Sequence, residues 1–216
     1  MGAPTSARTP AAGSAPLWTG ERPLLLASTS AARRALLAAA GIPVEAEASG
    51  VAEREVEESA GRVAPDALAL RLAQAKALAV SRRHPDRLVL GADQVLDLAG
   101  EVLHKPADRA AALRHLQRLS GRSHRLHSAG ALARGGSLLD GFVASASLSM
   151  RALSHDAMAR YLDAAGEAAL SGAGTYQVEG LGIHLFQSIA GDHSTILGLP
   201  LIPLLARLRD LGCLAI

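Results

Sequence analysis

Short apolar runs that lead through a polar turn into a helix limit what this chain can fold into. The first of them lies in the segment PLLLASTSAARRALLAAAGIPV. Leu24–Leu26 predicts a short buried strand, and Ser28 or Ser30 can cap the helix that follows. Gly41 is expected to end that helix. Exposed backbone N–H groups at a helix start attract anions, so Ser28, Ser30 and Arg33 mark a candidate anion site.

Helical and strand patterns alternate along the rest of the chain. Helices are predicted over residues 66–80, 108–121 and 154–166 and from Pro200 onward, and strands over residues 88–90, 124–133 and 141–153 and after the glycine-rich loop 173–182. The acidic stretch 45–65 fits neither pattern and is predicted to be irregular. Intermixed helices and strands are typical of an α/β fold in layers. The 216 residues suffice for one large domain or two small lobes.

Charge, cysteine content and hydropathy narrow the function classes. A formal net charge of +2 with scattered arginines predicts a solvated surface and no nucleic-acid partner. Cys213 is the only cysteine, which excludes disulfides within the chain and thiolate zinc clusters. Residues 1–22 lack a continuous apolar core and are predicted to be a disordered leader ahead of one domain, residues 23–216. No apolar stretch is long enough to cross a membrane, so we expect a cytoplasmic protein.

A carboxylate and an amide follow one of the predicted strands. The apolar run Leu88–Leu90 continues into the segment GADQV, which presents Asp93 and Gln94 directly after a glycine. Further along the chain, Lys105 precedes a proline. Lysine is rare here, because Lys76 and Lys105 are the only two among 22 lysines and arginines. A compact ammonium, rather than a planar guanidinium, is therefore indicated at these two positions.

These charged residues fit one reaction class. Hydrolysis of a phosphate ester needs cations and a metal to neutralise the oxygens, and an acid to orient or deprotonate the attacking water. Arg33, Lys76 and Lys105 supply cations. Glu53 and Asp93 supply carboxylates that can lie beside them. Other classes lack their signatures, since the chain has no GxxxxGK[ST] loop, no GxGxxG, no histidines at metal-ligand spacing and no Ser-His-Asp hydrolase context.

Several segments, taken in order, resemble the Maf family of nucleotide pyrophosphatases. They are LLLASTSAARRALLAAAGI, LRLAQAKALAV, LVLGADQVL, HKPAD, LSGRSHR, AGTYQVEGLG and ILGLPL. At compatible spacing they cover nearly everything from Leu24 to Gly212, so the resemblance is highly specific. It implies an α/β fold like that of inosine triphosphatase, in which a bent mixed β-sheet is flanked by helices and two lobes enclose a nucleotide-binding cleft. It also implies a homodimer and a divalent metal cation, Mg²⁺ or Mn²⁺.

The resemblance also implies roles for the residues that match its motifs. Binding of the phosphates is implied for Ser28, Arg33, Lys76 and Lys105. Asp93 would be the general base, and Glu53 would assist with the metal or the water, so these two carboxylates are the candidate metal ligands. The implied reaction is hydrolysis of the α–β phosphoanhydride bond of a nucleoside triphosphate to the monophosphate and diphosphate. Such an enzyme keeps modified nucleotides out of the pool.

Two positions resemble the branch of the family that hydrolyses 7-methyl-GTP. Gln94 follows the Asp, and Glu179 lies in QVEGLG, where the dTTP/UTP branch has Thr and Gln. Other positions depart from the family pattern, with Ala32 in place of Arg or Trp, Ala52 in place of Asp and His104 in place of Gly. Ala32 and His104 bear on base selectivity more than on the chemistry. The alternatives are a dTTP/UTP or broad-specificity pyrophosphatase, or a nucleotide-binding regulator of septum formation with weak catalysis.

Overall fold

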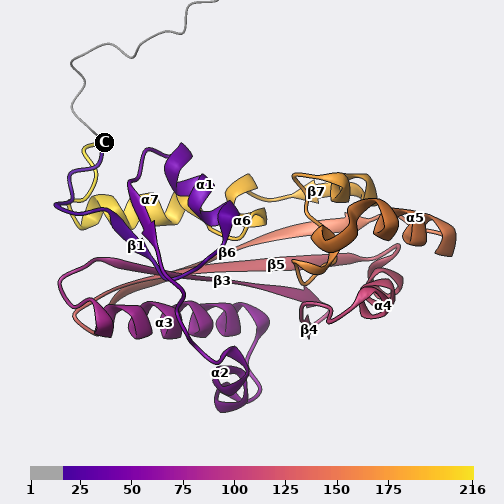
Figure 1. The fold of residues 1–216 in the computed structure, drawn as a ribbon, viewed down its shortest axis with the longest axis horizontal. Helices are drawn as coiled ribbons and strands as arrows, with labels where there is room; N and C mark the ends of the chain where they lie inside the picture. Colours follow the sequence, from indigo (N-terminus) through magenta and orange to yellow (C-terminus); the bar gives the residue numbers. More distant parts are fainter. Residues whose placement is uncertain (1–16) are drawn as a thin grey trace, which may run out of the picture.

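A mixed β-sheet runs the length of the molecule and carries helices on both faces (Figure 1). This computed structural model describes residues 17–216. Within them the sheet has seven strands: β1 (Leu24–Leu26), β2 (Val44–Ala46), β3 (Val89–Leu98), β4 (Glu101–Leu103), β5 (Ser123–Arg134), β6 (Ser137–Met150) and β7 (Phe186–Ala190). Their order is β2-β1-β3-β5-β6-β7, with β4 beside β3. β1 pairs in parallel with β2 and β3, and the other pairs are antiparallel.

The helices cover the sheet unevenly. They are α1 (Ala31–Ala39), α2 (Glu53–Ala60), α3 (Pro65–Arg83), α4 (Arg109–Leu119), α5 (His155–Ala165), α6 (His193–Ile196) and α7 (Leu201–Asp210), with 3₁₀ turns η1 (Gly166–Leu170) and η2 (Leu181–Leu185). Helices α1, α6 and α7 lie on one face and α3 on the other (Figure 1). β3 is buried along nearly its whole length because it lies between these layers. None of the helices in residues 17–216 is long and apolar enough to span a bilayer.

Three predicted helix starts are confirmed by their capping contacts. The side chains of Ser30, Asp108 and Ser154 each accept a hydrogen bond from the backbone N–H three residues further on. Each of these contacts satisfies a donor that the first turn of a helix leaves unpaired. The starts of α1, α4 and α5 are therefore set by local chemistry that the sequence shows directly.

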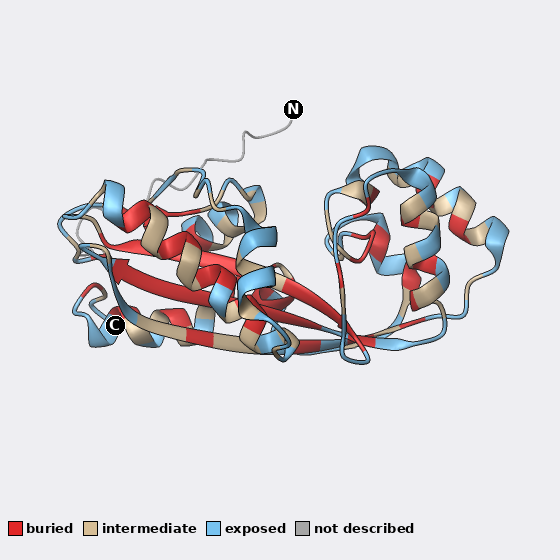
Figure 2. Ribbon diagram, turned by 90° about the horizontal axis from the view of Figure 1, so that it is seen from below, coloured by how far each residue is buried: buried red, intermediate tan, exposed pale blue. Residues whose placement is uncertain are grey.

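The molecule has two lobes that share the long strands β3, β5 and β6 (Figure 2). The larger lobe contains β1, β2, α1, α3 and α7, and the smaller lobe contains α4, α5, β7 and the 3₁₀ turns. Each lobe has its own apolar core, in which Leu90 and Leu132 are fully buried in the larger lobe and Leu116 and Leu148 in the smaller. The prediction of a mixed sheet flanked by helices in two lobes is confirmed.

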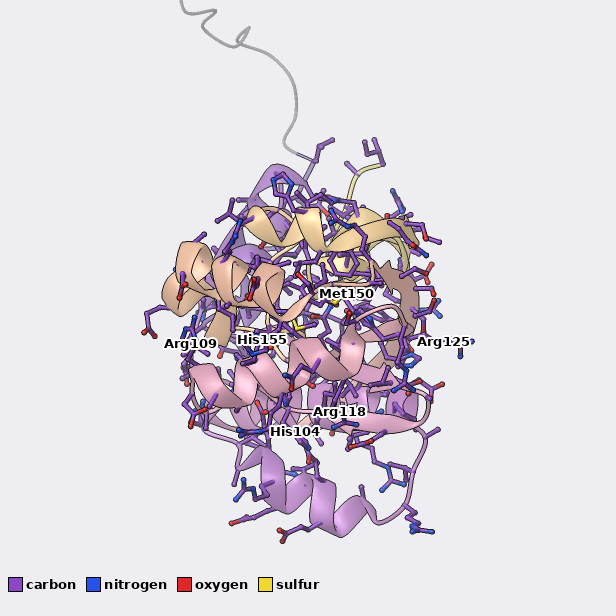
Figure 3. All side chains as sticks on the ribbon, turned by 90° about the vertical axis from the view of Figure 1, so that its right-hand side faces the viewer. His104, Arg109, Arg118, Arg125, Met150 and His155 are labelled. Carbon is purple, nitrogen blue, oxygen red and sulfur yellow. The ribbon has the colours of Figure 1, made fainter. Side chains whose placement is uncertain are left out.

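The smaller lobe is held together by contacts between its own helices. Figure 3 looks onto this end of the molecule, where α4 and α5 pack against each other. Arg109, at the start of α4, forms an ion pair with Asp163 of α5. Met150, at the end of β6, is buried in the core of this lobe.

Part of the predicted leader belongs to the larger lobe. Residues 1–16 lie outside the described part of the chain, but residues 17–22 can be followed. Trp18 is 8% exposed and packs in the core of the larger lobe, and its backbone bridges to that of Leu214. Because a buried tryptophan contributes a large apolar area and residues 17–19 pair with the C-terminal segment, this part of the chain is not a free leader.

One prediction about the larger lobe is wrong and another is confirmed. The stretch 45–65 is not irregular, because it contains part of β2 and the whole of α2. The only apolar residues of α2 are Val56 and Ala60, and neither is fully buried, so too few apolar positions mark this helix in the sequence. The predicted strand that presents Asp93 and Gln94 is confirmed as β3, which continues to Leu98 with Gly91 inside it. A Cβ at Gly91 would lie 2.1 Å from the carbonyl oxygen of Ala73, so this glycine lets α3 pack directly on β3.

Candidate functional site

A cleft of about 720 Å³ is lined by residues of both lobes. Its lining includes eight of the predicted site residues: Ser28, Arg33, Glu53, Lys76, Asp93, Gln94, Lys105 and Glu179. Ala32, in the first turn of α1, is not among the lining residues. A cleft of this volume is in the usual range for small-molecule sites. The structure therefore brings together residues that lie up to about 150 positions apart in the sequence.

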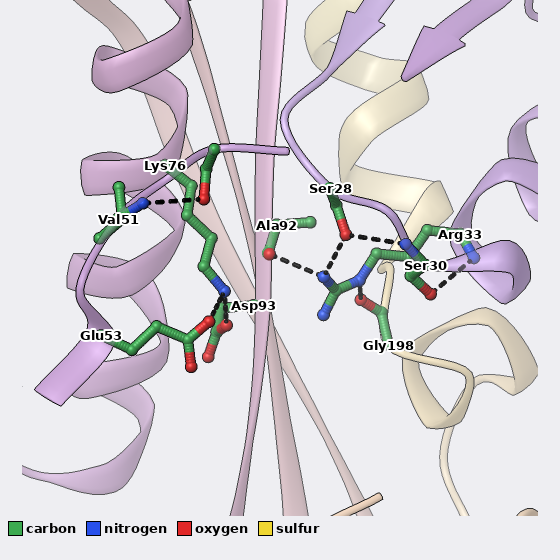
Figure 4. A network of polar contacts seen from close by, with 10 residues as sticks. Ser28, Ser30, Arg33, Val51, Glu53, Lys76, Ala92, Asp93 and Gly198 are labelled. Atoms are coloured by element: carbon green, nitrogen blue, oxygen red, sulfur yellow. Dashed lines mark hydrogen bonds and ion pairs between the residues drawn. The ribbon is translucent and has the colours of Figure 1, made fainter. Parts of the chain in front are cut away.

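An ammonium group held between two carboxylates lies at the buried side of the cleft (Figure 4). Lys76 Nζ lies 2.5 Å from Asp93 Oδ1 and 2.6 Å from Glu53 Oε1. Lys76 and Asp93 are each 7% exposed, whereas the Glu53 side chain on α2 is 55% exposed. The close packing of α3 on β3 at Gly91 brings Lys76 to this position. The cluster therefore extends from the buried base of the cleft, at Asp93 and Lys76, to its solvent-exposed side, at Glu53.

The two carboxylates of this cluster differ in proton affinity. Burial raises the pKa of Asp93, and the nearby charges of Lys76 and Arg33 only partly oppose it. Partial burial also acts to raise the pKa of Glu53, but its hydrogen bond to Lys76 and the charge of Lys76 outweigh burial and lower that pKa. Asp93 is thus the stronger proton acceptor of the pair. This difference is what a general base beside a charge-stabilising carboxylate requires.

Arg33 is fixed by three acceptors from different parts of the larger lobe (Figure 4). Its Nε donates to the carbonyl oxygen of Gly198 at 2.9 Å. Its Nη1 donates to Ser28 Oγ at 3.1 Å and to the carbonyl oxygen of Ala92 at 2.8 Å. The second terminal nitrogen, Nη2, takes no part in these bonds. A guanidinium anchored in this way can hold an anion at the start of α1 without losing its own position.

Gln94 lies beside Asp93 on β3, and its amide nitrogen is fully engaged by the protein. Gln94 Nε2 donates to Ser128 Oγ at 2.9 Å and to the carbonyl oxygens of Thr195 and Ile196 at 3.1 and 3.0 Å. The last two belong to α6, which Asp192 caps through a contact with the backbone N–H of Thr195. Sequence reasoning missed this support, although the pattern DHST, with Asp as the cap, indicates a helix start.

Lys105, between β4 and α4, and Glu179, in the loop before η2, both line the cleft, and both side chains are exposed to solvent. Sequence reasoning did not find two further charged residues of the lining, Arg54 and Glu57. Both lie on α2, the helix that was predicted to be irregular. Glu57 follows Glu53 by one helical turn, so recognising the helix would have placed both carboxylates on one face.

The charges of the lining balance. Its cations are Arg33, Arg54, Lys76 and Lys105, and its carboxylates are Glu53, Glu57, Asp93 and Glu179. Four positive and four negative side chains leave the cleft without net charge when His104 is neutral. A polyanionic ligand would therefore need further positive charge to accompany it.

Comparison with known proteins identifies the family to which this cleft belongs. A family model described as Maf-like protein matches residues 23–211. The chain belongs to the Maf family. The match spans every strand and helix that contributes to the cleft.

Curated relatives share this Maf domain at high identity. A nucleoside triphosphate pyrophosphatase of Rhodopseudomonas palustris (strain BisB18) is 53% identical over 199 residues, which are 92% of this chain and 98% of the relative. A 7-methyl-GTP pyrophosphatase of Rhizobium johnstonii is 52% identical over 194 residues, 88% of this chain and 97% of the relative. The predicted Maf family and its enzyme class, a nucleoside triphosphate pyrophosphatase, are confirmed.

Similarity to solved structures is lower. A HAM1 protein from Coxiella burnetii has a TM-score of 0.39 and 18% identity, and the match covers 59% of this chain and 72% of that protein. The fold assignment therefore rests on the sheet and helices of this Maf-family chain and on its family match.

Proposed function

We propose that this protein hydrolyses the α–β phosphoanhydride bond of a nucleoside triphosphate, with 7-methyl-GTP as its preferred substrate. The products would be the nucleoside monophosphate and diphosphate. Relatives named for this class of activity match almost the whole chain. The catalytic and binding roles of the residues are assigned from one observation, the buried Lys76 ammonium between Asp93 and Glu53 in the cleft.

Asp93 is the general base in this proposal. Because burial raises its pKa, it takes a proton from water more readily than an exposed aspartate does. The water oxygen forms a bond to phosphorus, the bridging P–O bond of the anhydride breaks, and the diphosphate leaves with the electron pair. Lys76 and Arg33 bind phosphate oxygens, where negative charge develops. Both cations are held in position before substrate enters, so little reorganisation is needed.

A divalent cation, Mg²⁺ or Mn²⁺, fits the carboxylates of this cleft. Glu53 and Asp93 converge on one atom, Lys76 Nζ, so their oxygens are close enough to share a cation. Among the described residues there is no cluster of three or more His, Cys, Asp and Glu side chains suited to a metal. Mg²⁺ sites commonly combine one or two carboxylates with substrate phosphates. When bound, the cation would supply the positive charge that the balanced lining lacks.

The acceptors around the cleft favour a guanine base. Guanine presents two adjacent donors, N1–H and the exocyclic amine, which a carboxylate such as Glu179 can accept together. Gln94 uses its Nε2 for the protein, so its Oε1 is the amide atom that can contact a base. Alkylation at N7 adds positive charge to the ring, which Glu179 further favours. Uracil and thymine each offer only one ring N–H to these acceptors.

Product analysis of a nucleotide panel tests this proposal. The protein would be incubated with Mg²⁺ or Mn²⁺ and 7-methyl-GTP, GTP, UTP or dTTP, and the products separated by ion-exchange chromatography. We expect monophosphate and diphosphate, the highest kcat/KM for 7-methyl-GTP, and loss of turnover on addition of EDTA. A preference for UTP or dTTP would contradict the assignment of the base. Nucleotide binding without turnover would instead support a regulatory nucleotide-binding protein.

The Glu179→Gln variant tests how the base is selected. We expect the preference for 7-methyl-GTP over UTP to fall by about 1–3 kcal/mol, because the two guanine donors lose a matching pair of acceptors. Glu167→Gln is a matched control, since Glu167 is an exposed carboxylate of the same lobe outside the cleft lining. An unchanged preference in Glu179→Gln would show that Glu179 does not read the base.

A further inference from the structure

The wall of the cleft formed by residues 171–180 has no helix or strand, yet side chains anchor it from three elements. His115 Nδ1 of α4 lies 3.3 Å from the carbonyl oxygen of Ala173. Tyr161 OH of α5 donates to the carbonyl oxygen of Thr175 at 3.0 Å. His124 Nε2 of β5 lies 2.5 Å from Tyr176 OH. We call residues 171–180 the wall loop. It carries Glu179, so its position decides where that carboxylate lies.

The contact between His124 and Tyr176 is the most deeply buried of the three anchors. His124 is 2% exposed and Tyr176 is 8% exposed. The ring of Phe186 packs edge-on against Tyr176, with ring centroids 4.8 Å apart. Burial lowers the pKa of His124 to about 4 and raises that of Tyr176, so both groups are neutral at physiological pH. The loop is thus tied to β5 by a neutral hydrogen bond that solvent does not reach.

Packing alone does not require this hydrogen bond. A neutral imidazole can satisfy both nitrogens only with two partners, and His124 Nδ1 is buried without a partner in the described structure. Leucine and phenylalanine could fill this volume without leaving a polar atom unpaired, and such replacements are often neutral or stabilising. The polar pair therefore indicates a need for a specific geometry rather than for stability.

The backbone around Tyr176 is strained and closely packed. Thr175 has a φ of 63°, a left-handed conformation that is unfavourable for a β-branched residue, and it is fully buried. A Cβ at Gly174 would lie 2.1 Å from the Tyr176 ring. A Cβ at Gly182 would lie 2.5 Å from the carbonyl oxygen of Gln177. The wall loop thus holds Thr175 in an unfavourable conformation and leaves no room for a side chain at Gly174.

We infer that His124, acting through Tyr176, is a positioning residue that fixes the wall loop and so sets the selectivity of the cleft for its nucleobase. His124 itself is not among the cleft-lining residues, whereas Tyr176 and Glu179 are. Glu179 lies three residues beyond Tyr176, close enough along the chain for the anchor to control its position. This inference rests on the proposed function, because substrate selectivity is measured through hydrolysis of nucleoside triphosphates.

Three variants test the inference: Tyr176→Phe, His124→Leu and the double variant of both. Tyr176→Phe removes only the hydroxyl and leaves His124 without a partner. We expect a lower Tm, faster amide hydrogen exchange in the wall loop, and about a tenfold smaller ratio of kcat/KM between the best and worst triphosphates, mainly through KM. In the double variant both partners are apolar, so we expect Tm to recover while the ratio stays low.

Ser145→Ala provides a matched control. Ser145 Oγ lies 2.7 Å from Nδ1 of His127 on β5, so the change removes another contact between a hydroxyl and an imidazole, away from the wall loop. We expect the selectivity ratio to stay at the wild-type value. The inference is overturned if selectivity returns together with Tm in the double variant, or if Tyr176→Phe leaves amide exchange in the wall loop unchanged. Amide exchange needs no substrate, so it tests the anchoring of the wall loop independently of the enzyme activity. If the loop proves to be anchored but the protein hydrolyses no triphosphate, the proposed function is refuted, and the selectivity role with it.

Discussion

Replacing Asp93 by Asn separates the chemical role of this side chain from its structural role. Asparagine has nearly the same shape but cannot accept a proton from water. A positioned general base contributes a factor of about 10²–10⁴ to the rate. We therefore expect kcat to fall by that factor, which corresponds to roughly 3–5 kcal/mol of the activation barrier. Substrate binding should change much less, because Lys76 and Arg33 remain in place.

The same substitution breaks a buried ion pair, so its effect on the fold has to be measured separately. Removing one partner of a buried pair costs about 3–5 kcal/mol when the other charge is left alone. Here Glu53 still lies 2.6 Å from the ammonium of Lys76. We therefore expect a smaller loss of unfolding free energy, about 1–3 kcal/mol. The variant should remain folded at the assay temperature.

The assay compares diphosphate release at saturating triphosphate, with Tm measured on the same samples. Asp97→Asn is the matched control, because Asp97 lies four residues further along β3, is 9% exposed and is not a lining residue of the cleft. Its contact with the backbone N–H of Gly100 makes a loss of stability expected there too. If Asp93→Asn keeps more than about a tenth of the wild-type kcat, Asp93 is not the base. An equal loss in Asp97→Asn would trace the effect to the fold.

Three further outcomes are expected. Lys76→Arg should be less active than the wild type, since a planar guanidinium cannot replace an ammonium that contacts two carboxylates at 2.5 and 2.6 Å. The exposed Lys105 should also act as a point charge, so we expect Lys105→Arg to lose activity as well. Full activity in both Arg variants would contradict this role. Ala52→Asp should raise the free energy of unfolding by about 0.5–2 kcal/mol in a urea titration, because Ala52, the residue that precedes α2, provides no side-chain cap; an unchanged midpoint would show that no cap forms. Burial lowers the pKa of His124 from 6.5 to about 4, so between these values the unfolded chain binds a proton that the folded chain does not. Stability should therefore be complete above pH 6.5 and fall by roughly 3 kcal/mol as the pH drops to about 4, and this slope should be missing in His124→Leu.

The parts of this fold that are determined by residues adjacent in the sequence could be predicted. The caps at Ser30, Asp108 and Ser154 lie next to the helices they start, and apolar runs mark the strands β1 and β5. Helix α2 could not be predicted from apolar periodicity, because its only apolar residues are Val56 and Ala60. The length of β3 was missed for a different reason. Gly91 is needed where α3 approaches the strand, and no local sequence pattern shows that contact.

The candidate site was predictable only through its motifs. Isolated charges such as Lys76 and Asp93 carry little information by themselves, and family resemblance placed them together before the structure did. The contact between His124 and Tyr176 joins residues 52 positions apart. No local pattern marks such a pair, because the sequence around each residue does not differ from that around an ordinary buried histidine or tyrosine.

The strands β3, β5 and β6 extend through both lobes, and this continuity limits how the cleft can move. Two-domain enzymes often close on their substrates by rotation about a linker, which leaves each domain intact. In this protein both walls stand on one hydrogen-bonded sheet, so widening the cleft means bending three paired strands together. We therefore expect substrate to enter a groove that is already open, so its association rate should depend on diffusion and on the charges at the rim rather than on a closing step.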